Sequence, residues 1–189
     1  MVTPLAQDSR LGGGSVDNIV NAYCAATNSD VFEGKEWYAV ARTIALSIHP
    51  NGVGIIAALS PATAWDVNVI AAREIVDHGD TKWQNSANKD KARRIMDGED
   101  ALDVLGGNKV RAFYKAIAGI GDEPVIDRHA LSVFIGRHAG DKGAKVLERK
   151  GAYAYVAKAY RKAAKVLGVD PHTVQAVTWV TWRNNNATA

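Results

Sequence analysis

The sequence predicts an all-α protein, and three observations lead to that prediction. Apolar residues recur at the three- and four-residue spacing of helices along most of the chain. Strand-like alternation of apolar and polar residues is almost absent, and the chain contains no internal repeat. Ser, Asp, Pro and Gly stand where such residues cap or end helices.

Each expected helix is bounded by a cap or a breaker. Ser15 is the predicted N-cap of the first helix, and His49-Pro50 ends the second because a residue before proline resists helical geometry. Pro61 and Pro171 suit the first helical position. The expected helices are 16–27, 33–49, 52–59, 61–78, 89–96, 101–105, 108–118, 128–138, 142–167 and 171–183.

These helices are expected to form a single domain, residues 15–183, made of two lobes. One lobe is expected at about 34–140, and the other combines 15–30 with 142–183. Residues 1–14 are expected to be a flexible leader that ends in a glycine run, and residues 184–189 a polar tail.

Composition narrows the class of protein. Of 189 residues, 47% are hydrophobic and 23% charged, which is ordinary for a soluble globular protein, and the net charge of +3 permits a nucleic-acid partner without requiring one. A single cysteine, Cys24, excludes an intrachain disulfide and a cysteine-ligated cluster, and the histidines lack metal-ligand spacing, so no metal is predicted. The longest apolar run, 53–59, is too short to span a membrane, and no secretory signal is recognised.

Two neighbouring features suggest a site that binds a phosphate and carries out a reaction. They are the segment 105–109, Leu-Gly-Gly-Asn-Lys, and Asp127. A Gly-Gly turn between two helices lets backbone amides approach a phosphate, and Lys109 adds a cation there. Asp127, at the start of the next helix, is an N-cap whose rigid, ionised carboxylate could stabilise an oxocarbenium-like centre. Taken separately, the segment 105–109 can equally be read as an ordinary turn and Asp127 as an ordinary helix cap.

Two further groups of residues are candidates for binding a base. Trp65 and Asn68 share a helix face near Ser60, where a ring could stack on a base and an amide read its edge; core packing is the alternative. The last helix places Gln175, Trp179, Trp182 and Arg183 on one stripe. Basic residues that could contact phosphates are Lys89, Lys91, Arg93, Arg94, Lys158, Arg161, Lys162 and Lys165.

The segment 105–137 resembles the helix-hairpin-helix plus Gly/Pro-Asp signature of the endonuclease III-like DNA glycosylase superfamily. Lys109 falls on the lysine that starts the second hairpin helix, Asp127 on the catalytic aspartate and His129 on the histidine that follows it. The hairpin is shorter than the family's usual Leu-Pro-Gly-Val-Gly, and the family's frequent iron–sulfur cysteines are missing. The resemblance implies a two-lobed helical bundle that acts on DNA.

The segments 34–38, 58–68 and 175–183 resemble a phage and bacterial branch of that superfamily. Some members of the branch are proposed to make hypermodified thymines. The residues that these resemblances and the residue types together assign are Asp127 and Lys109 for catalysis; Ser60, Trp65, Asn68, His129, Gln175, Trp179 and Arg183 for the substrate; and Gly106, Gly107, Asn108 and Arg128 for DNA.

Three functions are therefore expected as alternatives. The first is an enzyme that flips a nucleotide out of DNA and cleaves its N-glycosidic bond with Asp127. The second is a transferase that displaces pyrophosphate from a 5-pyrophosphoryloxymethyl pyrimidine with an amine, the one case that would call for Mg²⁺. The third is a non-catalytic module that binds DNA or inhibits a host factor. We expect a cytoplasmic location, that of the bacterial host if the chain is phage-encoded, with no membrane partner, no cofactor and a monomer as the default.

Overall fold

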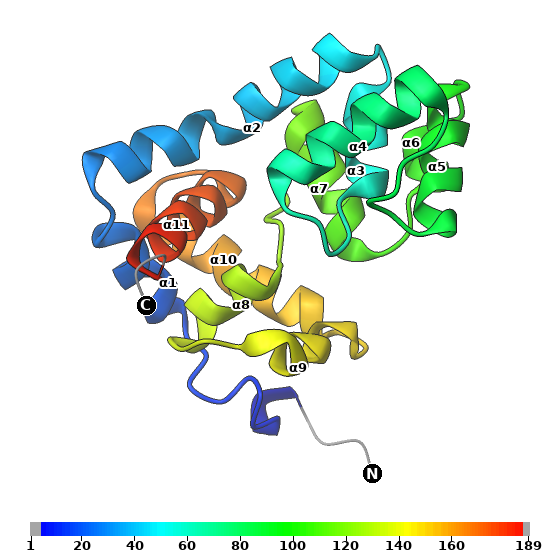
Figure 1. The fold of residues 1–189 in the computed structure, drawn as a ribbon. Helices are drawn as coiled ribbons and strands as arrows, with labels where there is room; N and C mark the ends of the chain where they lie inside the picture. Colours follow the sequence, from blue (N-terminus) through cyan, green and yellow to red (C-terminus); the bar gives the residue numbers. More distant parts are fainter. Residues whose placement is uncertain (1–4, 187–189) are drawn as a thin grey trace. The chain divides into compact units, whose positions relative to one another are not determined.

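The computed structural model describes residues 5–186 and confirms the all-α prediction: helices and no strands are found over that range (Figure 1). The α-helices are α1 (Val16–Cys24), α2 (Asn28–Ile48), α3 (Gly52–Leu59), α4 (Trp65–His78), α5 (Ser86–Met96), α6 (Ala101–Val104), α7 (Asn108–Ala118), α8 (Arg128–Ile135), α9 (Gly140–Ala144), α10 (Ala152–Leu167) and α11 (Pro171–Asn186). Two 3₁₀ helices, η1 (Leu5–Gln7) and η2 (Lys145–Glu148), complete the set.

Several expected helix ends differ from the observed ones: α1 ends at Cys24, α2 begins at Asn28 and α8 ends at Ile135. Two further differences follow from local backbone geometry. The helix expected from Pro61 begins at Trp65, because residues 61–64 form a turn in which Ala62 has a left-handed φ of 57°. The long helix expected over 142–167 is divided into α9, η2 and α10. Arg149 is extended and Gly151 has a φ of 81°, so the helical path ends there and restarts at Ala152.

The chain forms two compact units. The terminal unit contains the residues up to Trp37 and those from Asp122 onward, and the central unit contains Tyr38–Gly121. The division falls within α2. It differs from the expected lobes in that α8 belongs with the terminal helices, because α8 packs on α1, α10 and α11.

The central unit is built around α3. Every residue of this helix is buried, as expected of a helix that is apolar on all sides, and α4, α5 and α7 pack around it (Figure 1). Two glycines allow this packing: a Cβ on Gly52 would lie 1.9 Å from the Ala45 carbonyl oxygen, and one on Gly54 would lie 2.7 Å from Ile95 Cγ2. The small residues of α3 therefore set the spacing of its neighbours.

The core of the terminal unit lies among α1, α8, α10 and α11. Ser15 caps α1 as predicted, its Oγ accepting a hydrogen bond from the Asn18 amide at 3.0 Å. Residues 5–14, expected to belong to a flexible leader, instead pack on this unit: Leu11 is buried in the core, and Asp8 pairs with Arg149. Residues 1–4 of that leader lie outside the described residues. Of the expected polar tail, 184–186 extend α11 and 187–189 are not described.

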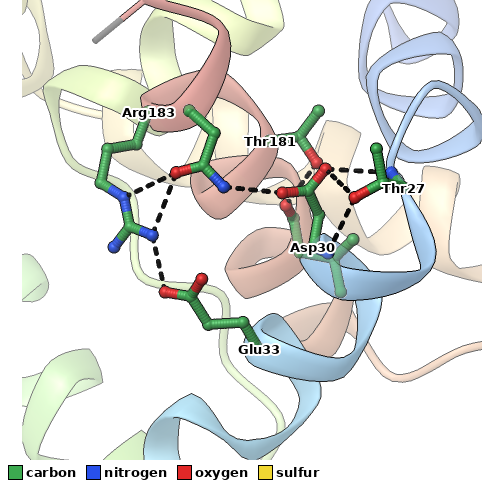
Figure 2. Close-up of polar contacts among 7 residues, drawn as sticks. Thr27, Asp30, Glu33, Thr181 and Arg183 are labelled. Atoms are coloured by element: carbon green, nitrogen blue, oxygen red, sulfur yellow. Dashed lines mark hydrogen bonds and ion pairs between the residues drawn. The ribbon is translucent and has the colours of Figure 1, made fainter.

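A polar network joins the start of α2 to the end of α11 (Figure 2). Thr27 and Asp30 form a capping box: Asp30 Oδ2 accepts from the Thr27 amide at 2.9 Å and its hydroxyl at 2.8 Å, while Thr27 Oγ1 accepts from the Asp30 amide at 3.1 Å. Asn184 donates to Asp30 Oδ1 at 2.7 Å, and Arg183 pairs with Glu33 at 2.6 Å. The backbone and hydroxyl donors of Thr27, with Asn184, hold the pKa of the Asp30 carboxyl below its usual range, although burial opposes this.

Replacing Asp30 with Ala should destabilise the protein by about 1–2 kcal/mol at neutral pH, because a cap and a link between helices are lost together. Since the folded pKa of Asp30 is lowered, the wild type's advantage should be present above about pH 4 and should shrink as the pH falls through the lowered value. Urea unfolding at a series of pH values measures both effects. Glu36→Ala, an exposed change on the same helix, is the control and should leave stability unchanged.

Candidate functional site

Asp127 caps α8, as predicted. Its backbone is extended, with a φ of −108°, and Oδ1 accepts a hydrogen bond from the Ala130 amide at 2.8 Å. The side chain is half-buried, and its second oxygen, Oδ2, accepts no hydrogen bond from the residues the structure describes. Asp127 therefore presents a fixed carboxylate with one oxygen available to a ligand.

Two tyrosines of α10 hold the segment that carries Asp127. The Tyr153 hydroxyl accepts from the Ile126 amide at 3.1 Å and donates to the Pro124 carbonyl at 3.2 Å, and the buried Tyr160 donates to the Ala130 carbonyl at 3.0 Å. Burial, with the charges of Glu123 and Asp127, raises the pKa of Tyr153 to about 12, and burial also raises that of Tyr160. Both hydroxyls thus stay protonated and act as positioning groups.

Aromatic rings gather beside α8 in the same unit. His129 meets Trp179 edge-on, with ring centroids 6.4 Å apart, and Trp37 meets the same indole at 5.6 Å. The Arg183 guanidinium lies over the Trp179 ring at 4.8 Å. The structure thus brings together three of the predicted substrate residues, His129, Trp179 and Arg183. Gln175, predicted at a pocket edge, is only 4% exposed.

Trp37 is the member of this aromatic group that sequence reasoning did not assign to the site. It reaches Trp179 because α2 and α11 approach closely at Gly34, where a Cβ would lie 2.5 Å from Val177 Cα. The signal was present as the spacing between Gly34 and Trp37, which places both near one face of a helix. The partner helix lies far along the chain, so spacing alone could not identify the contact.

The predicted DNA-binding turn lies in the central unit. Gly107 is the N-cap residue of α7 with a φ of 76°, a conformation that favours glycine, and Asn108 and Lys109 open the helix as exposed side chains. Arg111 donates to the Leu102 carbonyl and, at 3.1 Å, to the Leu105 carbonyl, which ties α6 to α7 across the turn. The turn geometry therefore depends on Arg111, which the sequence had not singled out.

Ser60 and Asn68 have structural hydrogen bonds in the central unit. Ser60 Oγ donates to the Ala57 carbonyl at 2.9 Å, and Asn68 Nδ2 donates to the Ile56 carbonyl at 3.0 Å, so both satisfy the C-terminal end of α3. Asn68 is 2% exposed, and its Oδ1 has no hydrogen-bond partner in the described part of the chain. Trp65 is half-buried at the start of α4.

The remaining predicted residue, Arg128, is exposed and pairs with Asp141 at 2.6 Å. Within residues 5–186, no group of three or more His, Cys, Asp or Glu side chains could hold a metal ion. Over the same range, no helix has the length and apolar character needed to cross a membrane. Asp127, His129, Gln175, Trp179 and Arg183 thus belong to the terminal unit, whereas Ser60, Trp65, Asn68 and Lys109 belong to the central unit.

Residues 2–186 match a family described as a family of unknown function, DUF7178. The chain belongs to the DUF7178 family. No curated protein and no solved structure matches it. An assignment of function to this DUF7178 protein therefore rests on the geometry of its own residues.

Gly34→Ala should destabilise the DUF7178 protein by about 1–3 kcal/mol, because the added methyl would clash with the backbone of α11 and push Trp37 away from Trp179. Urea unfolding measures the loss, and tryptophan fluorescence of the folded state should change with it. Gly143→Ala is the matched control, since its Cβ would meet only the Ala139 Cβ at 3.7 Å. Equal stability of the two variants would show that α2 and α11 are not so tightly packed.

Proposed function

We propose that this DUF7178 protein acts on a base in DNA, taking an extruded nucleotide and cleaving its N-glycosidic bond with the help of Asp127. The observation that carries the proposal is the state of that carboxylate. One oxygen is fixed by the Ala130 amide, and the other accepts no hydrogen bond from residues 5–186. A carboxylate held in this way can stabilise positive charge that develops on a sugar ring.

The neighbouring rings support a base as the ligand. Trp179 and His129 offer aromatic faces and edges in the same unit as Asp127, and Arg183 is a cation beside them. Enzymes that act on a base in DNA take it out of the stack and hold it between aromatic or apolar side chains. The rings of Trp179 and His129 in the terminal unit are aromatic side chains of the type that holds an extruded base.

In the proposed reaction, the bond between C1′ and the base nitrogen breaks and its electron pair leaves with the base, which takes up a proton. Asp127 stabilises the oxocarbenium-like sugar by its negative charge. A water oxygen then bonds to C1′ and passes a proton to the carboxylate, which returns it to solvent; the proton on the departed base comes from solvent. The products are a free base and an abasic sugar, and the step requires no metal ion or other cofactor.

The central unit contributes the proposed contact with the DNA backbone. The exposed turn at Gly106 and Gly107, the start of α7 and the Lys109 ammonium together suit a phosphate group. Its resemblance to a helix-hairpin-helix element, with a lysine in the family's position, supports this assignment. In the proposed arrangement the two units are the lobes of a glycosylase-like bundle.

Asp127→Asn should abolish at least about 99% of base release while leaving the protein folded, because asparagine preserves the cap and removes the charge. Purified protein is incubated with phage, bacterial and base-modified DNA, and nucleosides and free bases are identified by mass spectrometry. Asp170→Asn, which changes an exposed aspartate that also precedes a helix, is the control and should retain full activity.

The same experiment separates the alternatives. Free base released by the wild type supports excision, and full activity of Asp127→Asn contradicts the role of this carboxylate. A newly modified pyrimidine in place of free base would assign the protein to group transfer instead. Unchanged DNA from every source would favour a module that binds without catalysis.

Lys109→Ala should weaken binding to DNA about equally for all sequences and should reduce the slope of log K against log salt by about 1, because one phosphate contact is lost. Fluorescence anisotropy with a labelled duplex at several salt concentrations gives the slope. Lys35→Ala, an exposed lysine on α2, is the control. An unchanged slope for Lys109→Ala would remove this residue from the DNA interface.

A further inference from the structure

A cavity of about 320 Å³ opens in the central unit, and none of the candidate residues for acting on DNA lines it. Its walls come from α2, α3 and α7, the end of α5 and the segment 98–101. The volume falls at the lower end of the range for small-molecule sites. The cavity is thus of a size for a metabolite rather than a polymer.

Most of the accessible surface of the cavity is polar, and a smaller part of it is apolar. Val53, Ile95 and Ala101 are buried core residues that line it, and Leu46 of α2 lines it as a large, 47% exposed side chain. These side chains come from four different helices of one compact unit. They provide a surface for a small aliphatic group.

One unpaired cation lines the cavity. Arg42 is exposed on α2, and its Nη1 would lie 3.1 Å from a Cβ on Gly119, so the guanidinium lies against the end of α7. No carboxylate in the described part of the chain pairs with Arg42, and the half-buried hydroxyl of Tyr114 has no hydrogen-bond partner there either. A guanidinium with unused donors binds a carboxylate in bidentate fashion, and a tyrosine hydroxyl can add a third donor.

Two adjacent carboxylates, Glu99 and Asp100, also line the cavity, and they differ in whether their oxygens already have partners. Both oxygens of Glu99 accept hydrogen bonds from Arg94, at 2.9 and 2.7 Å, so this charge already has a partner in an exposed ion pair. Asp100 Oδ1 accepts from the Leu102 amide at 2.7 Å and caps α6, while Oδ2 accepts no hydrogen bond from residues 5–186. Asp100 therefore retains an oxygen that can bind an ammonium group.

We propose that this cavity binds a free amino acid with a small or medium apolar side chain. The carboxylate lies at Arg42 and the Tyr114 hydroxyl, the ammonium lies at Asp100, and the side chain rests on the apolar surface. A simple carboxylate is disfavoured by Asp100 and a simple amine by Arg42, because each would meet a like charge without its own partner. The site is separate from the proposed excision chemistry, which uses none of these residues.

The test uses the full chain and isothermal titration with L-alanine, L-valine and L-leucine. At least one should bind saturably with a dissociation constant below about 1 mM. For L-leucine, the analogues 4-methylpentanoate and 3-methylbutylamine each lack one charged group and should bind at least about tenfold more weakly. Failure of all three amino acids to saturate by about 10 mM, or equal binding of either analogue, overturns the proposal.

Variants locate the binding. Arg42→Ala removes the cation from an exposed position, and Asp100→Asn removes the charge while keeping a good helix cap; each should weaken binding about tenfold or more. Arg73→Ala, an exposed arginine on α4, is the matched control and should bind like the wild type. Circular dichroism confirms that the variants are folded. Unchanged affinity in folded Arg42→Ala would place the amino acid elsewhere and overturn the assignment.

Discussion

The close approach of α2 to α11 at Gly34 is the constraint on which the terminal unit depends. Only a residue without a side chain leaves room for the Val177 backbone at that point. Near this contact the Thr27–Asp30 capping box accepts a hydrogen bond from Asn184 (Figure 2). Trp37, on the same helix as Gly34, packs against Trp179. The close packing at Gly34 thus allows both the hydrogen bond between Asn184 and Asp30 and the contact between Trp37 and Trp179.

Hydrogen bonds with two tyrosine hydroxyls are a second constraint on the structure of the same unit. The extended segment before α8 has no neighbouring strand to bond with, so its backbone groups need other partners. Tyr153 serves two of them, and Tyr160 bonds to the first turn of α8. Because those hydroxyls come from a helix packed in the core, the segment that delivers Asp127 is fixed by the core itself.

Local signals predicted much of the fold. The helices at 52–59 and 108–118, the Ser15 cap and the Asp127 cap all follow from residues within one or two turns of each other, where propensity and capping act. The helix break at Gly151 is also a local effect, but lysine-rich and alanine-rich sequence on both sides conceals it. Whether a glycine ends a helix depends on the φ angle that tertiary packing imposes on it, and that angle cannot be predicted from the neighbouring residues.

Non-local contacts account for what the sequence could not predict. Leu11 is buried against core residues distant in sequence, and Asp8 pairs with Arg149, so a glycine-rich segment that looks like a leader is ordered. Trp37 joins the aromatic group through a helix that begins more than a hundred residues later. Among the candidate residues, Trp179 and Arg183 touch because they lie four residues apart on α11, which helical spacing predicts. His129 reaches Trp179 only because α8 packs on α11, which spacing does not predict.

The ion pairs refine the view of the protein's charge. The basic residues of α5 that could have met phosphates are largely neutralised, since Lys89 and Arg93 pair with Asp80 and Arg94 pairs with Glu99. The basic stripe of α10, at 158–165, forms no ion pair with any residue in the range 5–186. Long-range attraction to a polyanion would therefore come from the stripe of α10 more than from α5. In the proposed function, contacts of the extruded base and sugar with Asp127 and with the rings of Trp179 and His129 would add to this attraction.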